Sequence, residues 1–361
     1  MQNKPMVIAW HLPQFHQIPE NDKWWGEGFT EWTNIKKAKP LFKGHYQPRV
    51  PLNNNYYNML DKETMQWQHQ ISTAYGVDAF CYYHYWFDGK MLLEKPMENL
   101  LEWKDIPQKF CISWANEPWS RTWSGTHDKE VLMPQKYSGE EGWKKHFDYL
   151  IKFFLDERYI KVDNCPVFLL YRANSIPDCD AMIECWDKWA KENGLNGMHI
   201  IETINAFQTE SVCCNSKATV KMRPMKQTKR GSFFTRAIRK MKRILNRCYG
   251  KVPVEQLYSM IIKEYNNAVA LGYSKPSYDS GFISWDNAPR RANNALIYIK
   301  ESPKLFENFM TQMFQIAKKD NAPFLFFNAW NEWCEGTYLE PDEKYGYAYL
   351  EALKRAKESV L

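Results

Sequence analysis

"PFLFFNAWNEW", residues 323–333, begins as an apolar run and ends in amides, tryptophans and a glutamate. A short apolar run after a proline is typical of a strand that is buried on both faces, as in a parallel sheet. Six further segments follow the same scheme: "VIAWHLP" (7–13), "VDAFCYYHYW" (77–86), "KFCISWAN" (109–116), "PVFLLYR" (166–172), "HIIETI" (199–204) and "GFISWDN" (281–287). The recurrence predicts buried strands that each end in polar and aromatic side chains.

Helix-like stretches separate most of these segments, for example at 140–156, 181–193 and 303–319. Strands that alternate with helices indicate a parallel sheet. The chain has 361 residues, and this length predicts one (β/α)8 TIM-type barrel domain over 1–361, with one strand unassigned. A doubly wound open sheet is the alternative, but no Gly-rich phosphate turn follows the first strand.

The segment 18–57 differs from a strand–helix unit. It is long, aromatic and rich in proline and glycine. Such a segment predicts an ordered loop after the first strand, long enough to wall a cleft. We expect Trp25, Glu31 and Trp32 to face a ligand there.

The residues at the predicted strand ends point to a sugar-binding cleft. In a barrel, these ends form the active site. Flat rings stack on pyranose faces, and amides, imidazoles and carboxylates bind the hydroxyls. The expected sugar ligands at the strand ends are His11, Gln14, Tyr83, His84, Tyr85, Trp86, Trp114, Asn116, Glu117, Trp119, Trp285, Asn328, Trp330 and Asn331.

Glu332 and Glu335 are the candidate catalytic residues. They stand three apart among tryptophans at a strand end, and two carboxyl groups in one aromatic cleft suit glycosidic bond chemistry. Crowding and burial should keep one of them protonated near neutral pH. The alternative is a pair of surface acids. Glu117 is a third candidate, or a structural ion pair, while His11 and His84 either orient a group or are packed in the core.

The composition of the whole chain indicates the compartment in which the protein is expected. No apolar run reaches the ~20 residues of a membrane span, and the N-terminus shows no signal-peptide pattern. Nine cysteines include no CxxC pair, which favours reduced thiols in a cytoplasm. There is no zinc-ligand spacing, so the sequence predicts no metal and no cofactor.

A basic segment interrupts the pattern. Residues 217–251 contain thirteen lysines and arginines and no acid, whereas the whole chain has a net charge of only +6. Residues 233–250 place apolar and basic side chains on opposite faces of an expected helical insertion. That arrangement is typical of a helix lying on an anionic membrane. A solvated insert without a partner is equally open, and nucleic acid is disfavoured because the rest of the chain is acidic.

Five motifs together resemble one family. "WHLPQFH", "WWGEGFTEW", "YYHYWF", "WANEPW" and "WNEWCEGTYLEP" resemble the WbsX family, described as glycosyltransferases or glycoside hydrolase family 99-like proteins of bacterial polysaccharide clusters. The family is similar in fold to the family 99 endo-α-mannosidases, which are (β/α)8 barrels.

The resemblance also implies roles. Residues 330–337 match the W-N-E-W-x-E-G-T signature of family 99. By that match Glu335 would be the acid/base for the leaving oxygen. Glu332 would deprotonate the sugar 2-hydroxyl, which then attacks C1 to give an anhydro intermediate. Glu117, in "ANEPW", would bind sugar.

The expected function is therefore an enzyme that acts on glycosidic bonds in O-antigen or capsule metabolism. Its expected substrate is an oligo- or polysaccharide, free or lipid-linked, and its expected place is the cytoplasm or the inner face of the inner membrane. A true glycosyltransferase or a transglycosylase is the alternative, although no DxD-type metal motif stands beside a nucleotide-binding fold. A non-catalytic glycan-binding barrel would not need both acids.

Overall fold

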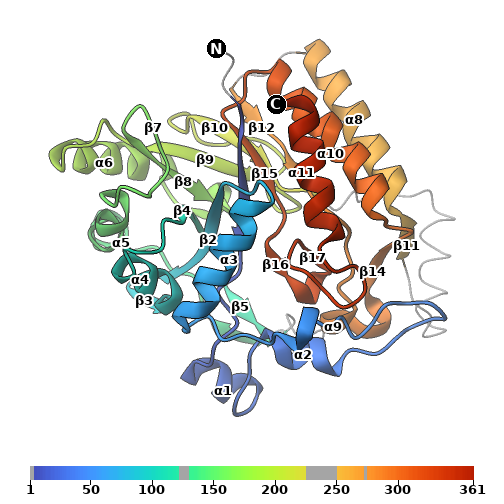
Figure 1. The fold of residues 1–361 in the computed structure, drawn as a ribbon. Helices are drawn as coiled ribbons and strands as arrows, with labels where there is room; N and C mark the ends of the chain where they lie inside the picture. Colours follow the sequence, from blue (N-terminus) through green and yellow to red (C-terminus); the bar gives the residue numbers. More distant parts are fainter. Residues whose placement is uncertain (1–3, 122–129, 225–249, 272–274) are drawn as a thin grey trace, which may run out of the picture.

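The computed structural model describes residues 4–121, 130–224, 250–271 and 275–361. Its main sheet is parallel and forms the centre of the molecule (Figure 1). In spatial order from β12 to β13 its strands are β12 (Ser277–Tyr278), β10 (Ala218–Lys221), β9 (His199–Ile204), β8 (Cys165–Leu170), β4 (Lys109–Trp114), β2 (Ala79–Phe87), β1 (Met6–His11), β15 (Phe324–Phe327) and β13 (Ser280–Gly281).

The first and last strands of this order, β12 and β13, are consecutive in the chain. Only Asp279 separates β12 from β13. Ser277 pairs with Thr219 of β10 on one side, and Gly281 pairs with Phe327 of β15 on the other. Residues 277–281 therefore act as one interrupted strand that joins both edges. The predicted TIM-type barrel is confirmed, and the open sheet is wrong.

Two strand assignments need correction. The strand that the sequence left unassigned is β10, which lies inside the segment predicted as a basic insertion. It was missed because it is short, follows Lys217 and ends in Lys221. The strand predicted at 281–287 ends at Gly281, and residues 282–287 extend beyond the sheet toward the site. Residues 225–249, with the expected amphipathic helix, lie outside the described residues.

Helices surround the barrel (Figure 1). The three stretches predicted from periodicity form α5 (Glu140–Phe154), α6 (Cys179–Glu192) and α10 (Pro303–Lys319). In α10, Phe306, Phe309, Met313 and Ala317 recur at helical spacing and are buried. The other barrel helices are α3 (Lys62–Ala74), α4 (Lys95–Glu102), α8 (Val254–Leu271) and α11 (Ala348–Val360).

Further short helices and strands lie outside the barrel strands and the helices that surround them. The additional helices and 3-10 turns are α1 (Pro19–Trp25), α2 (Glu31–Lys37), α9 (Ala288–Arg291), η1 (Leu52–Asn54), η3 (Ala173–Ser175), η4 (Ala292–Asn294) and η5 (Trp333–Glu335). The additional strands are β3 (Lys90–Leu92), β5 (Trp119–Ser120), β6 (Val131–Met133), β7 (Lys161–Val162), β11 (Gly250–Pro253), β14 (Leu296–Ile299), β16 (Asn331–Glu332) and β17 (Thr337–Tyr338).

The segment 18–57 is ordered, as expected, but it contains the short helices α1 and α2. These helices lie with α9 at the same end of the barrel (Figure 1). Trp32 of α2 is buried, packs 4.6 Å from Phe15 between ring centroids, and donates its indole N–H to the Tyr57 carbonyl at 2.9 Å. Trp32 therefore packs the segment against the core, and no residue of 18–57 lines the cavity described below.

Two further findings concern the chain as a whole. Within the described ranges, no helix combines the length and apolar character needed to cross a bilayer. The cysteines of those ranges are all free thiols, and most of them are buried.

Candidate active site

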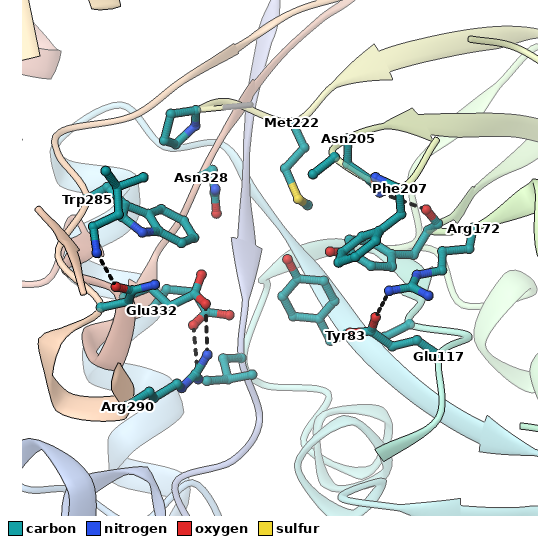
Figure 2. A pocket seen from close by; sticks show the side chains of 18 of the residues that line it. Tyr83, Glu117, Arg172, Asn205, Phe207, Met222, Trp285, Arg290, Asn328 and Glu332 are labelled. Carbon is teal, nitrogen blue, oxygen red and sulfur yellow. Dashed lines mark hydrogen bonds and ion pairs between the residues drawn. The ribbon is translucent and has the colours of Figure 1, made fainter. Parts of the chain in front are cut away.

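A cavity of about 470 Å³ opens at the carboxyl ends of the barrel strands (Figure 2). Every strand of the barrel contributes a lining residue, either from its carboxyl-terminal half or from the segment that follows it. In chain order they include Leu12, Tyr83, Glu117, Arg172, Asn205, Met222, Trp285 and Asn328. This is where TIM barrels build their active sites, and the volume is in the range of pockets that enclose small organic ligands.

The turn that carries both glutamates follows β15. Glu332 ends β16, which pairs with β17, and Glu335 ends η5. Asn331 fixes the start of the turn, because its side-chain amide exchanges hydrogen bonds with the Leu12 backbone at 2.7 and 3.0 Å. Both glutamates line the cavity.

Arg290 of α9 joins three carboxyl groups. Its Nη1 lies 2.9 Å from Glu335 Oε1, and its Nη2 lies 3.0 Å from Glu31 Oε1 and 3.6 Å from Glu332 Oε2. The guanidinium is nearly buried, and Glu31 is only 1% exposed. A buried charge requires a partner, and here one cation serves three acids.

Burial raises the pKa of Glu332 to about 8, and the negative charge of Glu335 adds to the effect. Arg290 opposes the rise, whereas Glu31 contributes to it. The raised pKa favours the protonated form of Glu332 near neutral pH, whereas Glu335 is ion-paired with Arg290. The sequence predicted that one of the two acids would stay protonated.

Asp286 connects this turn to the segment 18–57. It accepts hydrogen bonds from His45 Nε2 at 2.8 Å and Gln47 Nε2 at 2.7 Å, and its backbone N–H donates to the Glu335 carbonyl at 2.6 Å. Burial alone would raise the pKa of this carboxyl group, but these bonds and the charge of Arg49 leave it below the ordinary value. Asp286 therefore stays ionised and holds the turn in place.

Gly336 permits the close contact between this turn and Asp286. Its φ is +63°, and a Cβ there would lie 2.8 Å from Asp286 Cβ and 2.9 Å from the Asp286 nitrogen. We expect Gly336→Ala to destabilise the fold, by about 1–2 kcal/mol for the left-handed backbone and about 1–3 kcal/mol more for overpacking. It should also lower activity, because Glu335 is the neighbouring residue. Denaturant unfolding measures the stability.

Gly346→Ala is the matched control. Gly346 also has a positive φ, +53°, but no atom lies within 4 Å of its Cβ position. The Gly346→Ala variant should lose only the stability that the left-handed backbone costs, and its activity should equal that of the wild type. Equal losses in the two variants would contradict the steric explanation.

Strand β2 shows which predicted aromatic residues reach the cavity. Side chains alternate along a strand, so Tyr83 and Tyr85 line the cavity while His84 and Trp86 point outward. His84 Nε2 lies 3.0 Å from Nε2 of His146 on α5, and the Trp86 ring stacks on His146. Burial, and then the charge of Glu332, raises the pKa of both cavity tyrosines well above its ordinary value.

The predicted ligands divide into two groups. Those that line the cavity are Tyr83, Tyr85, Glu117, Trp119, Trp285, Asn328, Glu332 and Glu335. Those that do not line it are His11, Gln14, Trp25, Glu31, Trp32, His84, Trp86, Trp114, Asn116, Trp330 and Asn331.

Several members of the second group contact other parts of the protein. His11 is hydrogen-bonded to Gln68, and Asn116 donates to the Arg172 carbonyl. Trp114 and Trp330 are buried in the core. These four side chains are therefore buried and do not line the cavity.

Several cavity residues were absent from the predicted site. They include Arg172, Asn205, Phe207, Met222 and Arg290. Tyr171 and Arg172 end the strand predicted at 166–172 and Asn205 follows the one predicted at 199–204, so all three stand at predicted strand ends. Arg290 lies beyond a strand end in a short helix, and nothing local distinguishes it.

Comparison with known sequences identifies the family of this chain. The family described as "Glycosyltransferase WbsX" matches residues 7–353. The chain belongs to this family. The "Uncharacterized protein WxcX" from two strains of Xanthomonas campestris pv. campestris is 33% identical over 356 residues, covering 97% of this chain. The match covers 49% of that relative, so this chain spans about half its length.

Solved structures of glycoside hydrolases share the fold. A "Glycoside hydrolase-like protein" superposes with a TM-score of 0.61 at 14% identity, covering 98% of this chain and 94% of the other. The family 99 endo-alpha-mannosidase from Bacteroides thetaiotaomicron gives 0.55 at 12% identity, with 98% and 97% covered. The WbsX membership and the barrel fold therefore agree with the family and the fold that the sequence predicted.

Proposed function

We propose that this WbsX protein makes or breaks glycosidic bonds, with Glu332 and Glu335 as its acid and base. The observation that carries the proposal is the arrangement of two carboxyl groups around buried Arg290, in a cavity lined by aromatic rings. Acid and base groups placed together on a sugar-sized cavity are what this reaction needs. A non-catalytic binding site would gain nothing from burying a protonated glutamate there.

Arg290 allows the two glutamates to exchange roles. Its Nη1 lies 2.9 Å from Glu335, and its Nη2 lies 3.6 Å from Glu332. A small movement of the guanidinium would pair it with Glu332 instead, and the proton would then pass to Glu335. We propose this exchange on sugar binding, so that Glu335 donates the proton to the leaving oxygen. Glu332, then ionised beside Arg290, acts as the base.

The same site suits hydrolysis or transfer, since only the acceptor differs. The name of the family favours transfer to a sugar acceptor, and the fold resembles that of hydrolases. We propose as substrate an oligo- or polysaccharide, free or lipid-linked, of the bacterial cell surface. A cytoplasmic enzyme held at an anionic membrane through the basic residues between β10 and β11 remains part of this proposal.

One experiment tests the reaction class. The purified protein is offered a panel of α-linked oligosaccharides and activated glycosyl donors, and mass spectrometry reports cleavage or transfer. Products that require Glu332 and Glu335 would support the proposal. Wild-type turnover in variants that lack both carboxyl groups would contradict it.

The pH dependence follows from the proton that the pair must hold. We expect kcat/KM to fall as pH rises through about 8. The pKa of Glu332 is raised to about 8, so above that pH the pair of Glu332 and Glu335 no longer holds the proton that the reaction needs. Glu31→Gln should move this limb to lower pH, because the charge of Glu31 contributes to the raised pKa. A rate that instead climbs through pH 8 would show that the deprotonated pair is the active form.

A further inference from the structure

Phe207 is an exposed ring on the wall of the cavity. It is 53% exposed and follows β9 in the loop toward β10. A phenylalanine is usually buried, since exposure forfeits its hydrophobic contribution. A single exposed ring proves little, so its surroundings decide its meaning.

The loop holds this ring in a defined place. Asn205 Oδ1 accepts hydrogen bonds from the backbone N–H groups of Phe207 and Gln208, at 2.8 and 3.1 Å. Asn174 Nδ2 donates to the Phe207 carbonyl at 3.1 Å. Gln208 Nε2 donates in turn to buried Glu202 at 2.8 Å. The backbone is therefore fixed while the ring stays exposed, as expected for a surface prepared for a ligand.

An ion pair adjoins the ring. The Arg172 guanidinium lies 3.8 Å from the Phe207 ring centroid, and its Nη2 is paired with Glu117 Oε2. Both charged side chains line the cavity and are partly exposed, and Arg172 Nε is buried without a hydrogen-bond partner among the described residues. Figure 2 shows this group on the opposite side of the pocket from Glu332, Arg290 and Trp285.

These three side chains match the surface of a neutral sugar. The C–H face of a pyranose packs on an aromatic ring. A hydroxyl group both donates and accepts, so adjacent hydroxyls can donate to Glu117 and accept from Arg172. The paired charges offset each other, and an anionic sugar would meet repulsion from Glu117.

We propose that Phe207, Arg172 and Glu117 form a second sugar subsite, which takes a neutral pyranose with adjacent hydroxyls next to the reacting sugar. The substrate then spans both walls of the cavity and contains at least two sugar units. This inference rests on the proposed function, which places the reacting sugar at Glu332 and Glu335 on the opposite wall of the cavity.

Binding to the Glu335→Gln variant tests the subsite without turnover. The probes are neutral α-linked di- to tetrasaccharides of glucose, mannose and galactose, with the corresponding methyl glycosides, in titration calorimetry. Adding Phe207→Ala should weaken oligosaccharide binding about tenfold, as the loss of one aromatic contact predicts. Binding of the methyl glycosides should not change. Val212→Ala is the matched control, since Val212 is a 47% exposed apolar residue of the same loop that does not line the cavity.

Glu117→Gln supplies a second readout. It leaves the charge of Arg172 without its counter-charge from Glu117, so digalacturonic acid should gain affinity relative to its neutral counterpart. The proposal is overturned if no neutral oligosaccharide binds better than the methyl glycosides, or if Phe207→Ala binds them all as the parent does. Loss of turnover in the glutamate variants with no effect at Phe207 removes the subsite alone. Binding that depends on Phe207 without any turnover removes only the catalytic proposal.

Discussion

Glu335→Gln and Glu332→Gln are each expected to lower the rate of the glycosidic reaction by about 10²–10⁴-fold, while sugar still binds. Glutamine keeps the shape of glutamate but cannot exchange a proton, so the loss reports the chemistry. Both residues line the cavity beside Arg290. The measurement is steady-state kinetics on the best substrate of the panel.

The leaving group separates the two roles. A glycosyl fluoride needs little protonation as it departs, so the variant that lacks the acid should retain much more activity on it. We expect this for Glu335→Gln and not for Glu332→Gln. The opposite pattern would make Glu332 the donor, in line with its raised pKa.

Glu351→Gln is the control for these variants. Its carboxyl group is exposed on α11, away from the cavity, so its rate should equal that of the wild type. If Glu332→Gln and Glu335→Gln also matched the wild type, the catalytic assignment would fail.

Arg290→Met is expected to cost about 3–5 kcal/mol of stability, because it removes one partner from a buried ion pair. It should also lower kcat by about 10²–10³-fold, the effect of losing one well-placed charged donor. Arg290 opposes the rise in the pKa of Glu332, so the alkaline limb of the surviving activity should move to higher pH. Denaturant unfolding and a pH–rate profile measure these effects.

A double variant separates stability from catalysis. Glu31→Gln with Arg290→Met removes both charges of the 3.0 Å pair, so much of the stability should return. The activity should stay low, because Glu335 still lacks its partner. Recovery of activity in the double variant would mean that Arg290 serves only to neutralise Glu31. A stable and fully active Arg290→Met would contradict its role in the site.

Much of the site could be predicted because the carboxyl ends of all the parallel strands lie at the same end of a barrel. This rule placed Tyr83, Glu117, Trp285 and Glu332 correctly around the cavity. It failed where consecutive residues were all taken as ligands. On β2 the alternation of side chains allows only every second residue to face the cavity, which excludes His84 and Trp86.

The sequence by itself determined the barrel and the position of the glutamate pair, because both depend on local information. Apolar runs and helical spacing specify strands and helices, and the WNEWCEG turn keeps Glu332 and Glu335 adjacent whatever surrounds it. The tertiary structure alone decided how this pair is charged. Arg290 comes from 45 residues before Glu335, and Glu31 lies 259 residues from Arg290. Burial and the approach of distant charges, which set a pKa, exist only after the barrel has closed and brought these three segments together.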